Sequence, residues 1–109
     1  MMIDTIKFIM KISIVSANIS EYSKTQTCAK FCHDSFKKLD CTPNLILLNE
    51  YNLPHCDGKE CYSNKEVQAL TKEIEDSEAI IIVTPIYNYN CNSITKNFIE
   101  LTNNRTKEG

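Results

Sequence analysis

A short, nearly continuous run of β-branched residues constrains the fold of this chain more than any other feature. Residues 79–84 read AIIIVT, and such a run is typical of a parallel strand that is covered on both faces. Pro85 follows directly and ends the strand, because proline has no backbone N–H for a neighbouring strand. We therefore expect a buried parallel strand that ends at residue 84.

Two further apolar runs, KISIVS at residues 11–16 and LILL at residues 45–48, also have the character of strands. Between and after the three runs, apolar residues recur at helical spacing. They form three groups: Cys28, Cys32, Phe36 and Leu39; Val67, Leu70 and Ile74; and Ile94, Phe98 and Leu101. Alternation of strands and helices predicts right-handed βαβ units on a parallel sheet, an α/β fold.

One helix has a recognisable beginning. Ser63 or Asn64 is suited to cap the second helix, and Glu66 would lie in its first turn. The loop before it, residues 49–64, is long and contains Pro54 and Gly58 as breakers.

The length of the chain allows three strand–helix pairs. A βαβ unit takes about 30 or more residues, and the chain has 109. We expect one domain over residues 10–103, a leader or mis-assigned start over residues 1–9, and a polar tail over residues 104–109. A five-stranded doubly wound sheet would need roughly half as many residues again, so the sequence predicts a truncated domain with three of five units.

Charge and hydropathy exclude two classes of partner. The net charge is −2 and no Lys/Arg-rich run is present, which argues against nucleic-acid binding. No apolar stretch approaches the roughly 18–20 residues that span a bilayer, and the amino terminus does not resemble a signal peptide. We therefore expect a cytoplasmic protein that has no membrane partner and whose six cysteines are free thiols.

The loop after the first strand, VSANISEYSKTQT at residues 15–27, is rich in hydroxyl and amide groups. Its amides and hydroxyls precede a predicted helix, whose N-terminal N–H groups and positive partial charge favour a phosphate. An ordinary Ser/Thr-rich helix cap explains the same residues. The candidate binding residues here are Ser16, Asn18, Ser20, Ser23, Lys24 and Thr25.

The loop after the third strand is the second candidate. Its backbone groups, the Tyr87 ring and the Asn88 amide would lie at the rim of the sheet, where they are suited to the edge of a planar heteroaromatic ring. An Asn-rich turn at a strand end is the alternative interpretation. The candidate binding residues are Pro85, Ile86, Tyr87 and Asn88.

At these spacings the two loops resemble those of the NADPH-dependent FMN reductase family, which has a flavodoxin-like fold. That family reads roughly S-G-S-L-R-x-x-S-x-N after its first strand and T-P-E-Y-N-G-S-x-P-G-x-L-K-N after its third. Residues 84–97 align with the second motif without a gap, and residues 16 and 23 match serines of the first. The agreeing positions of the second motif are Thr84, Pro85, Tyr87, Asn88, Lys96 and Asn97.

The resemblance implies a function as well as a fold. It implies FMN bound across the ends of strands 1 and 3, with its phosphate on the first loop and its isoalloxazine ring against the second. NAD(P)H would be the hydride donor, and a small-molecule electron acceptor would be reduced. Because the flavin supplies the chemistry, no catalytic side chain is expected. Relatives are commonly dimers or tetramers, which implies a possible homo-oligomer.

Several positions depart from the family pattern. Ala17, Asn18 and Ser20 replace the Gly, Ser and Arg of the first loop, so Lys24 would offer a point charge in place of a forked cation. Tyr89 stands where Gly is usual, and a Tyr with φ > 0 costs about 1 kcal/mol or more. Without a fourth strand, the third becomes a bare edge and a pairing hazard. We therefore expect the chain alone to bind FMN weakly or not at all and to have weak or absent activity, and we expect a second copy or a partner to cover this edge.

The chain has six cysteines and two histidines, but their spacing is not typical of a metal site. Cys56 and Cys61 have a C-x4-C spacing across a turn, in the loop where some relatives hold an iron–sulfur cluster, but the closely spaced third and fourth cysteines are missing. Cys28 and Cys32 are expected on the buried face of the first helix, as small hydrophobic residues. We therefore predict no metal site.

Two other functional classes remain open at this stage. A flavodoxin-type electron carrier would keep FMN without a nicotinamide site. A vestigial or assembly module would use the exposed strand edge to pair with a partner or with itself.

Overall fold

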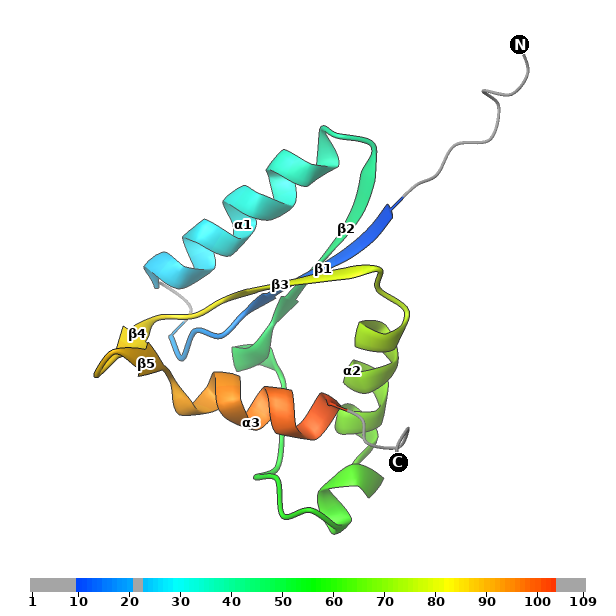
Figure 1. The fold of residues 1–109 in the computed structure, drawn as a ribbon, viewed down its shortest axis with the longest axis vertical. Coiled ribbons are helices and arrows are strands. Elements are labelled where there is room, and N and C mark those ends of the chain that lie inside the picture. The colour runs from blue at the N-terminus through cyan, green and yellow to red at the C-terminus, as the bar shows by residue number, and fades with distance from the viewer. Residues whose placement is uncertain (1–9, 21–22, 104–109) are drawn as a thin grey trace, which may run out of the picture.

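The computed structural model describes residues 10–20 and 23–103 and confirms the predicted α/β architecture. The expected leader (residues 1–9) and tail (residues 104–109) lie outside the described residues. Three parallel strands form a sheet in the order β2-β1-β3 (Figure 1). The elements are β1 (Met10–Ser16), α1 (Lys24–Lys37), β2 (Cys41–Leu47), α2 (Lys65–Glu75), β3 (Ala79–Val83), β4 (Ile86–Tyr87), β5 (Asn90–Cys91) and α3 (Ser93–Thr102), with short 3-10 turns at Leu48–Glu50 and Glu60–Ser63.

The helices cover the two faces of the sheet. Helix α1 packs on one face, and α2 and α3 lie together on the other (Figure 1). Strand β1 is central. Its last residue, Ser16, is paired with Leu47 of β2 on one side and with Val83 of β3 on the other. The order β2-β1-β3 is the first part of the doubly wound order 2-1-3-4-5.

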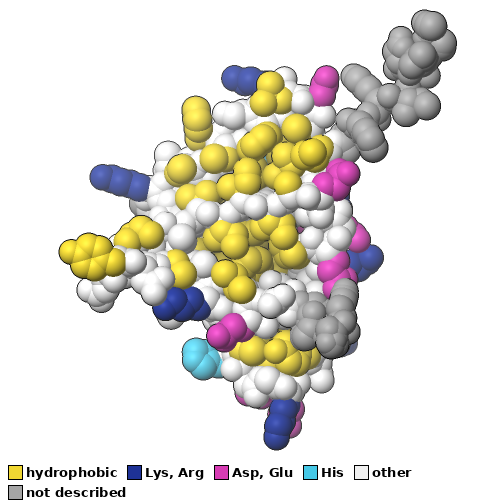
Figure 2. Space-filling view, in the orientation of Figure 1, with side chains coloured by type: hydrophobic (Ala, Val, Ile, Leu, Met, Phe, Trp, Pro, Cys, Tyr) yellow, Lys and Arg dark blue, Asp and Glu magenta, His cyan; other side chains and the backbone are white. Residues whose placement is uncertain are grey.

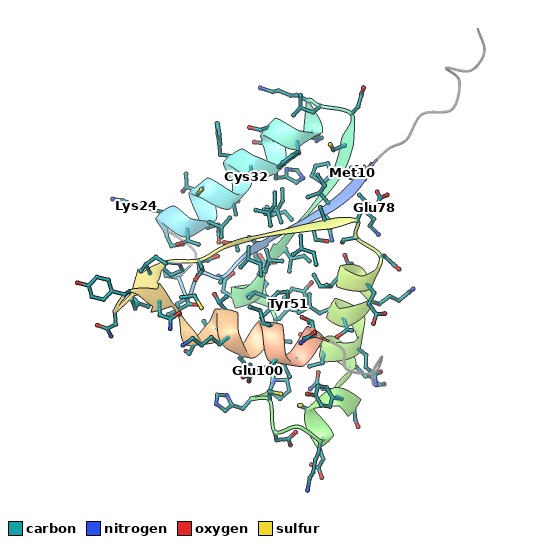
Figure 3. The ribbon with its side chains drawn as sticks, viewed as in Figure 1. Met10, Lys24, Cys32, Tyr51, Glu78 and Glu100 are labelled. Carbon is teal, nitrogen blue, oxygen red and sulfur yellow. The ribbon has the colours of Figure 1, made fainter. Side chains whose placement is uncertain are left out.

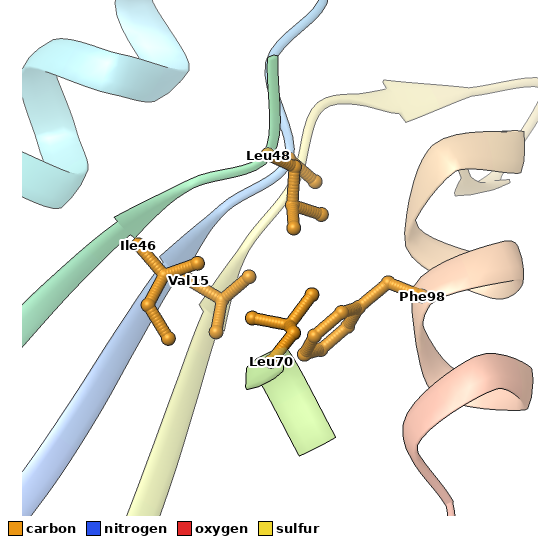
Figure 4. Close-up of a cluster of buried hydrophobic side chains, with 6 residues drawn as sticks. Val15, Ile46, Leu48, Leu70 and Phe98 are labelled. Atoms are coloured by element: carbon orange, nitrogen blue, oxygen red, sulfur yellow. The ribbon is translucent and has the colours of Figure 1, made fainter. Parts of the chain in front are cut away.

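Each face of the sheet has its own hydrophobic core. On the α1 face, Ile12 and Ile14 pack with Ala29. On the opposite face, the buried cluster draws on two strands, a 3-10 turn and both helices, and consists of Val15, Ala17, Ile46, Leu48, Leu70 and Phe98 (Figure 4). Alternate residues of β1 therefore serve opposite cores, as the two-residue period of a strand requires.

The helix beginnings follow capping chemistry. Of the two candidates for α2, Asn64 is the N-cap, and its Oδ1 accepts from the N–H groups of Glu66 and Val67 at 2.9 and 3.1 Å. Ser23 caps α1 and Asn92 caps α3. Each cap satisfies N–H groups that have no partner within the helix.

The structure corrects two details of the helix and strand predictions. Strand β2 begins at Cys41, four residues earlier than expected, and includes Pro43. A proline is tolerated because β2 is an outer strand of this sheet. Cys28 and Leu39, both expected on the buried face of the first helix, are exposed, and Leu39 lies beyond the end of α1 at Lys37.

Strand β3 has a bare outer edge in the described sheet, because its sole strand partner there is β1. Apolar side chains gather on both sides of this strand (Figure 2), and Ile80 is 43% exposed. On the α3 side they border a groove of about 540 Å³, lined by Ile74, Glu75, Ile80, Ile82, Phe98, Ile99, Thr102 and Asn103. The predicted exposure of this edge is confirmed for the described residues.

No helix of the described residues has the length and apolar character needed to cross a membrane.

Candidate functional site

The two candidate loops lie at the same edge of the sheet. Ser16 and Val83, the last residues of β1 and β3, are paired in register. The next N–H, that of Ala17, donates to the Val83 carbonyl at 2.9 Å. Both loops therefore leave the sheet side by side, and the beginning of α1 faces the β4–β5 hairpin at this end of the molecule (Figure 1). The predicted meeting of the two loops is confirmed.

The first loop uses two of its polar side chains internally. Ser16 and Asn18 are buried, and the Ser16 hydroxyl donates to Asn18 Oδ1. Asn18 Nδ2 donates to the Ser20 carbonyl at 2.7 Å and to Gln26 Oε1 at 2.9 Å. These bonds fold the loop back onto the first turn of α1, so the two side chains shape the loop and do not face solvent.

The beginning of α1 has the character of an anion site. Ser23 Oγ accepts from the Gln26 N–H at 3.1 Å, which leaves the N–H groups of the first residues directed outward. The first turn of α1 contains no acidic residue, and Lys24 points into solvent there (Figure 3). Thr25 is half-buried and Ser20 is exposed, and Asn18 links the Ser20 carbonyl to the Gln26 side chain of the same turn. Partial charge, a cation and hydroxyl groups thus lie together.

The second loop is a two-stranded hairpin. Ile86 and Tyr87 of β4 pair with residues 91 and 90 of β5. The turn residues Asn88 and Tyr89 have φ values of 51° and 64°, the positive-φ geometry of a type I′ hairpin turn. Tyr89 therefore does stand in the left-handed region where the family pattern has Gly. Ile86 and Tyr87 are 65% and 53% exposed, so the hairpin offers apolar and aromatic surface next to the first loop.

Asn92, which the sequence analysis missed as a site residue, joins the two loops. Its Nδ2 donates to the Ala17 carbonyl at 2.8 Å, and its Oδ1 accepts from the Thr95 N–H at 3.0 Å. The hydroxyl of Thr95 also donates to Asn92 Oδ1 at 2.7 Å and lies 2.9 Å from that of Thr84. The position of Asn92 just before a predicted helix indicates a helix cap. Nothing in the sequence indicates its hydrogen bond to the first loop.

A hollow of about 270 Å³ opens beside the first loop, lined by Asn18, Ile19, Leu48, Asn49, Tyr51, Leu53, Ile94 and Asn97. Tyr51 extends beneath the sheet toward α3 (Figure 3). Burial, and then the carboxylates of Glu73, Glu50 and Glu66, raise the pKa of the Tyr51 phenol. Tyr51 is therefore a neutral hydrogen-bonding group at neutral pH.

Asn97 occupies one wall of this hollow and matches the family motif. Its Oδ1 accepts from the Cys56 N–H at 2.8 Å and its Nδ2 donates to the Pro54 carbonyl at 3.0 Å. Asn97 thus fixes α3 to the loop before α2. Its motif neighbour Lys96 is exposed.

The donor set of the described site fits a flavin mononucleotide. A helix N-terminus with Lys24 suits a phosphate, and the hairpin face suits a flat aromatic ring. Among the described residues, no three His, Cys, Asp or Glu side chains come together as a metal site would require.

Comparison with known families agrees with this geometry. The sequence profile of the NADPH-dependent FMN reductase family matches residues 10–108, which include both loops. A comparison with individual curated proteins gives no significant match. The match covers nearly the whole chain, which belongs to the NADPH-dependent FMN reductase family.

Proposed function

We propose that this protein binds FMN across the ends of β1 and β3 and acts as an NAD(P)H-dependent FMN reductase. The observation that carries the proposal is the bond between Asn92 and the Ala17 carbonyl, because it holds the two loops at one edge. Ligands of open parallel sheets bind at such carboxyl edges. FMN, when bound, supplies the two-electron chemistry that links a nicotinamide donor to a small-molecule acceptor.

Each loop has a separate task in this proposal. The first turn of α1, with Lys24, Thr25 and Ser20, holds the phosphate, while the buried Ser16 and Asn18 and the N-cap Ser23 keep the loop in shape. Pro85, Ile86, Tyr87 and Asn88 lie along the edge of the flavin ring. Lys24 is the sole cation in residues 16–20, 23–25 and 85–91, so we expect weak affinity.

FMN and riboflavin titrations of charge-neutral variants test the assignment of the two loops. Because a single exposed charge contributes at most about 1 kcal/mol, Lys24→Gln should weaken FMN binding about two- to fivefold. It should leave riboflavin binding unchanged, since riboflavin has no phosphate. Lys30→Gln, an exposed lysine further along α1, is the matched control. Equal loss in both lysine variants, or for both flavins, would contradict the phosphate assignment.

NADPH oxidation distinguishes a reductase from a flavodoxin-type electron carrier. We expect added FMN to raise NADPH consumption by the purified chain, and Tyr87→Ala to lower it together with the affinity for both flavins. Flavin binding without NADPH consumption would instead support the carrier. Absence of any flavin binding would refute the proposal.

We also propose that a second copy of the chain covers the outer edge of β3. Strand β3 carries no charged residue between Ala79 and Val83, so two antiparallel copies centred on Ile81 would pair apolar side chains on both faces. Such a pair would cover the exposed Ile80 and the neighbouring apolar groove. Exposed apolar edges of this kind are pairing sites.

The six cysteines are free thiols, which suits a reducing compartment. We propose the cytoplasm as the site of action for this reason.

A further inference from the structure

Two cysteines of the loop before α2 lie together, outside the proposed flavin site. The Sγ atoms of Cys56 and Cys61 are 3.8 Å apart, and the Cys61 thiol donates to the Cys56 sulfur. The Tyr62 hydroxyl lies 3.5 Å from Cys56 Sγ. The proposed reductase activity has no use for this group of side chains.

The loop is built to bring the two sulfurs together. Asp57 Oδ1 accepts from the N–H groups of Lys59 and Cys61 at 2.8 and 3.0 Å. Gly58 takes a φ of 77°, which a residue without Cβ adopts at little cost. The turn thus reverses the chain between the two cysteines. Asn97 holds the Cys56 N–H from α3 at 2.8 Å, which fixes the other end of the loop.

The two thiols differ in their surroundings. Cys61 is 3% exposed and packs with Val67 and Leu101, and burial raises the pKa of its thiol. Cys56 is partly exposed, and the hydrogen bond from Tyr62 is the main cause that lowers its pKa. An accessible thiol with a lowered pKa beside a buried thiol is the arrangement of an attacking and a resolving cysteine.

We propose that Cys56 and Cys61 form a reversible dithiol–disulfide pair that responds to hydroperoxides. The Cys56 thiolate attacks the terminal oxygen of the peroxide, the O–O bond breaks, and Cys56 becomes a sulfenic acid as hydroxide or alkoxide leaves. The Cys61 sulfur then forms the S–S bond and expels the sulfenic oxygen as water. Two thiols are oxidised by two electrons, and one peroxide is reduced to water and an alcohol, or to two waters.

Little movement is needed to close the bond. An S–S bond of about 2.0 Å requires the two sulfurs to approach by about 1.8 Å from their present separation. In a reducing compartment the pair rests as thiols, as expected for a transient, sensing disulfide.

Tryptic mapping of the oxidised wild-type chain tests the proposal directly, because Lys59 lies between the two cysteines. The reduced chain is treated with one equivalent of hydrogen peroxide, blocked with N-ethylmaleimide and digested with trypsin. We expect the peptides 39–59 and 60–65 to remain joined until a reductant separates them. Cys41 is also in the first peptide, so Cys41→Ser confirms the assignment. Oxidation without this linked pair would overturn the proposal.

Single variants test the order of events. In Cys61→Ser, peroxide should leave a sulfenic acid at Cys56 that dimedone traps, whereas Cys56→Ser should leave Cys61 unmodified. Exposed Cys28 is the internal control in every sample. Dimedone labelling of Cys28 equal to that of Cys56 would overturn the proposed selectivity, and the wild-type digest decides the linkage even if a variant fails to fold.

Discussion

The Asn92 side chain should contribute more to stability than an ordinary helix cap. In Asn92→Ala the cap of α3 is lost, which costs typically about 1 kcal/mol. The Ala17 carbonyl, in a fully buried residue, also loses the 2.8 Å bond from Asn92. An unsatisfied buried acceptor costs about 1–3 kcal/mol, so we expect a total loss of about 2–4 kcal/mol.

Two further variants separate these contributions. Asn64→Ala removes a cap alone, because Asn64 accepts from the N–H groups of its own helix, and should cost about 1 kcal/mol. Asn92→Ser keeps a capping hydroxyl but loses the amide that reaches Ala17, so it should cost about 1–3 kcal/mol. The gap between the Ala and Ser variants at position 92 should then equal the cost of Asn64→Ala.

Urea unfolding followed by far-UV circular dichroism measures these values, since the chain has no Trp for fluorescence. In thermal scans each kcal/mol should shift Tm by roughly 4–8 °C for a domain of this size. If Asn92→Ala is no worse than Asn64→Ala, or Asn92→Ser is as stable as wild type, the bond between the loops does not contribute as argued.

Three other substitutions have defined outcomes. Tyr89→Gly should raise the free energy of unfolding by about 1 kcal/mol, since Tyr89 is fully exposed at a φ of 64°; an unchanged urea midpoint would contradict this. Ile80→Lys should turn a dimer into a monomer by native mass measurement, whereas exposed Ile19→Lys should not; a monomeric wild type would refute the proposed pairing. The N–H groups of Lys59 and Cys61 lower the pKa of Asp57. The ionised Asp57 carboxylate therefore stabilises the folded state at neutral pH, and this stabilisation is lost as pH falls through the lowered pKa. Asp57→Asn should therefore be less stable than wild type at neutral pH, with a gap that narrows in acid; a gap independent of pH would contradict the linkage.

The parts of the fold that depend on simple periodicity could be predicted from sequence. The β-branched run of β3 and the alternation of strand and helix patterns along the chain indicated a parallel sheet, and the positions after β1 and β3 indicated the edge at which the candidate loops meet. These features follow from local composition and from the rule that parallel strands place their carboxyl ends together.

The beginning of β2 and the outer face of α1 could not be predicted in the same way. The apolar run begins at Leu45, but β2 begins at Cys41 and includes Pro43, because an outer strand tolerates a residue without N–H on its free side. Cys28 and Leu39 fit the helical period, yet α1 ends at Lys37 and both side chains remain exposed. In both cases the place of the residue in the folded structure, and not the local sequence pattern, decided the outcome.

Within the candidate site, the sequence indicated which residues gather but not what each side chain does. Ser16 and Asn18 were predicted to contact a ligand, and the structure shows them buried and bonded to each other. The hairpin was missed because its turn is Asn88–Tyr89 and lacks the glycine that usually signals a type I′ turn. Bonds between distant segments, such as Asn92 to Ala17, have no sequence signature.

The position of Pro43 in β2 limits how large an assembly built by strand pairing can grow. On the free side of that strand Pro43 has no N–H for a further ladder, while the opposite border of the sheet is fully able to pair. Association through one competent border is isologous and closes after two subunits, whereas fibres need two complementary surfaces. The described sheet therefore favours a finite complex over an open-ended polymer.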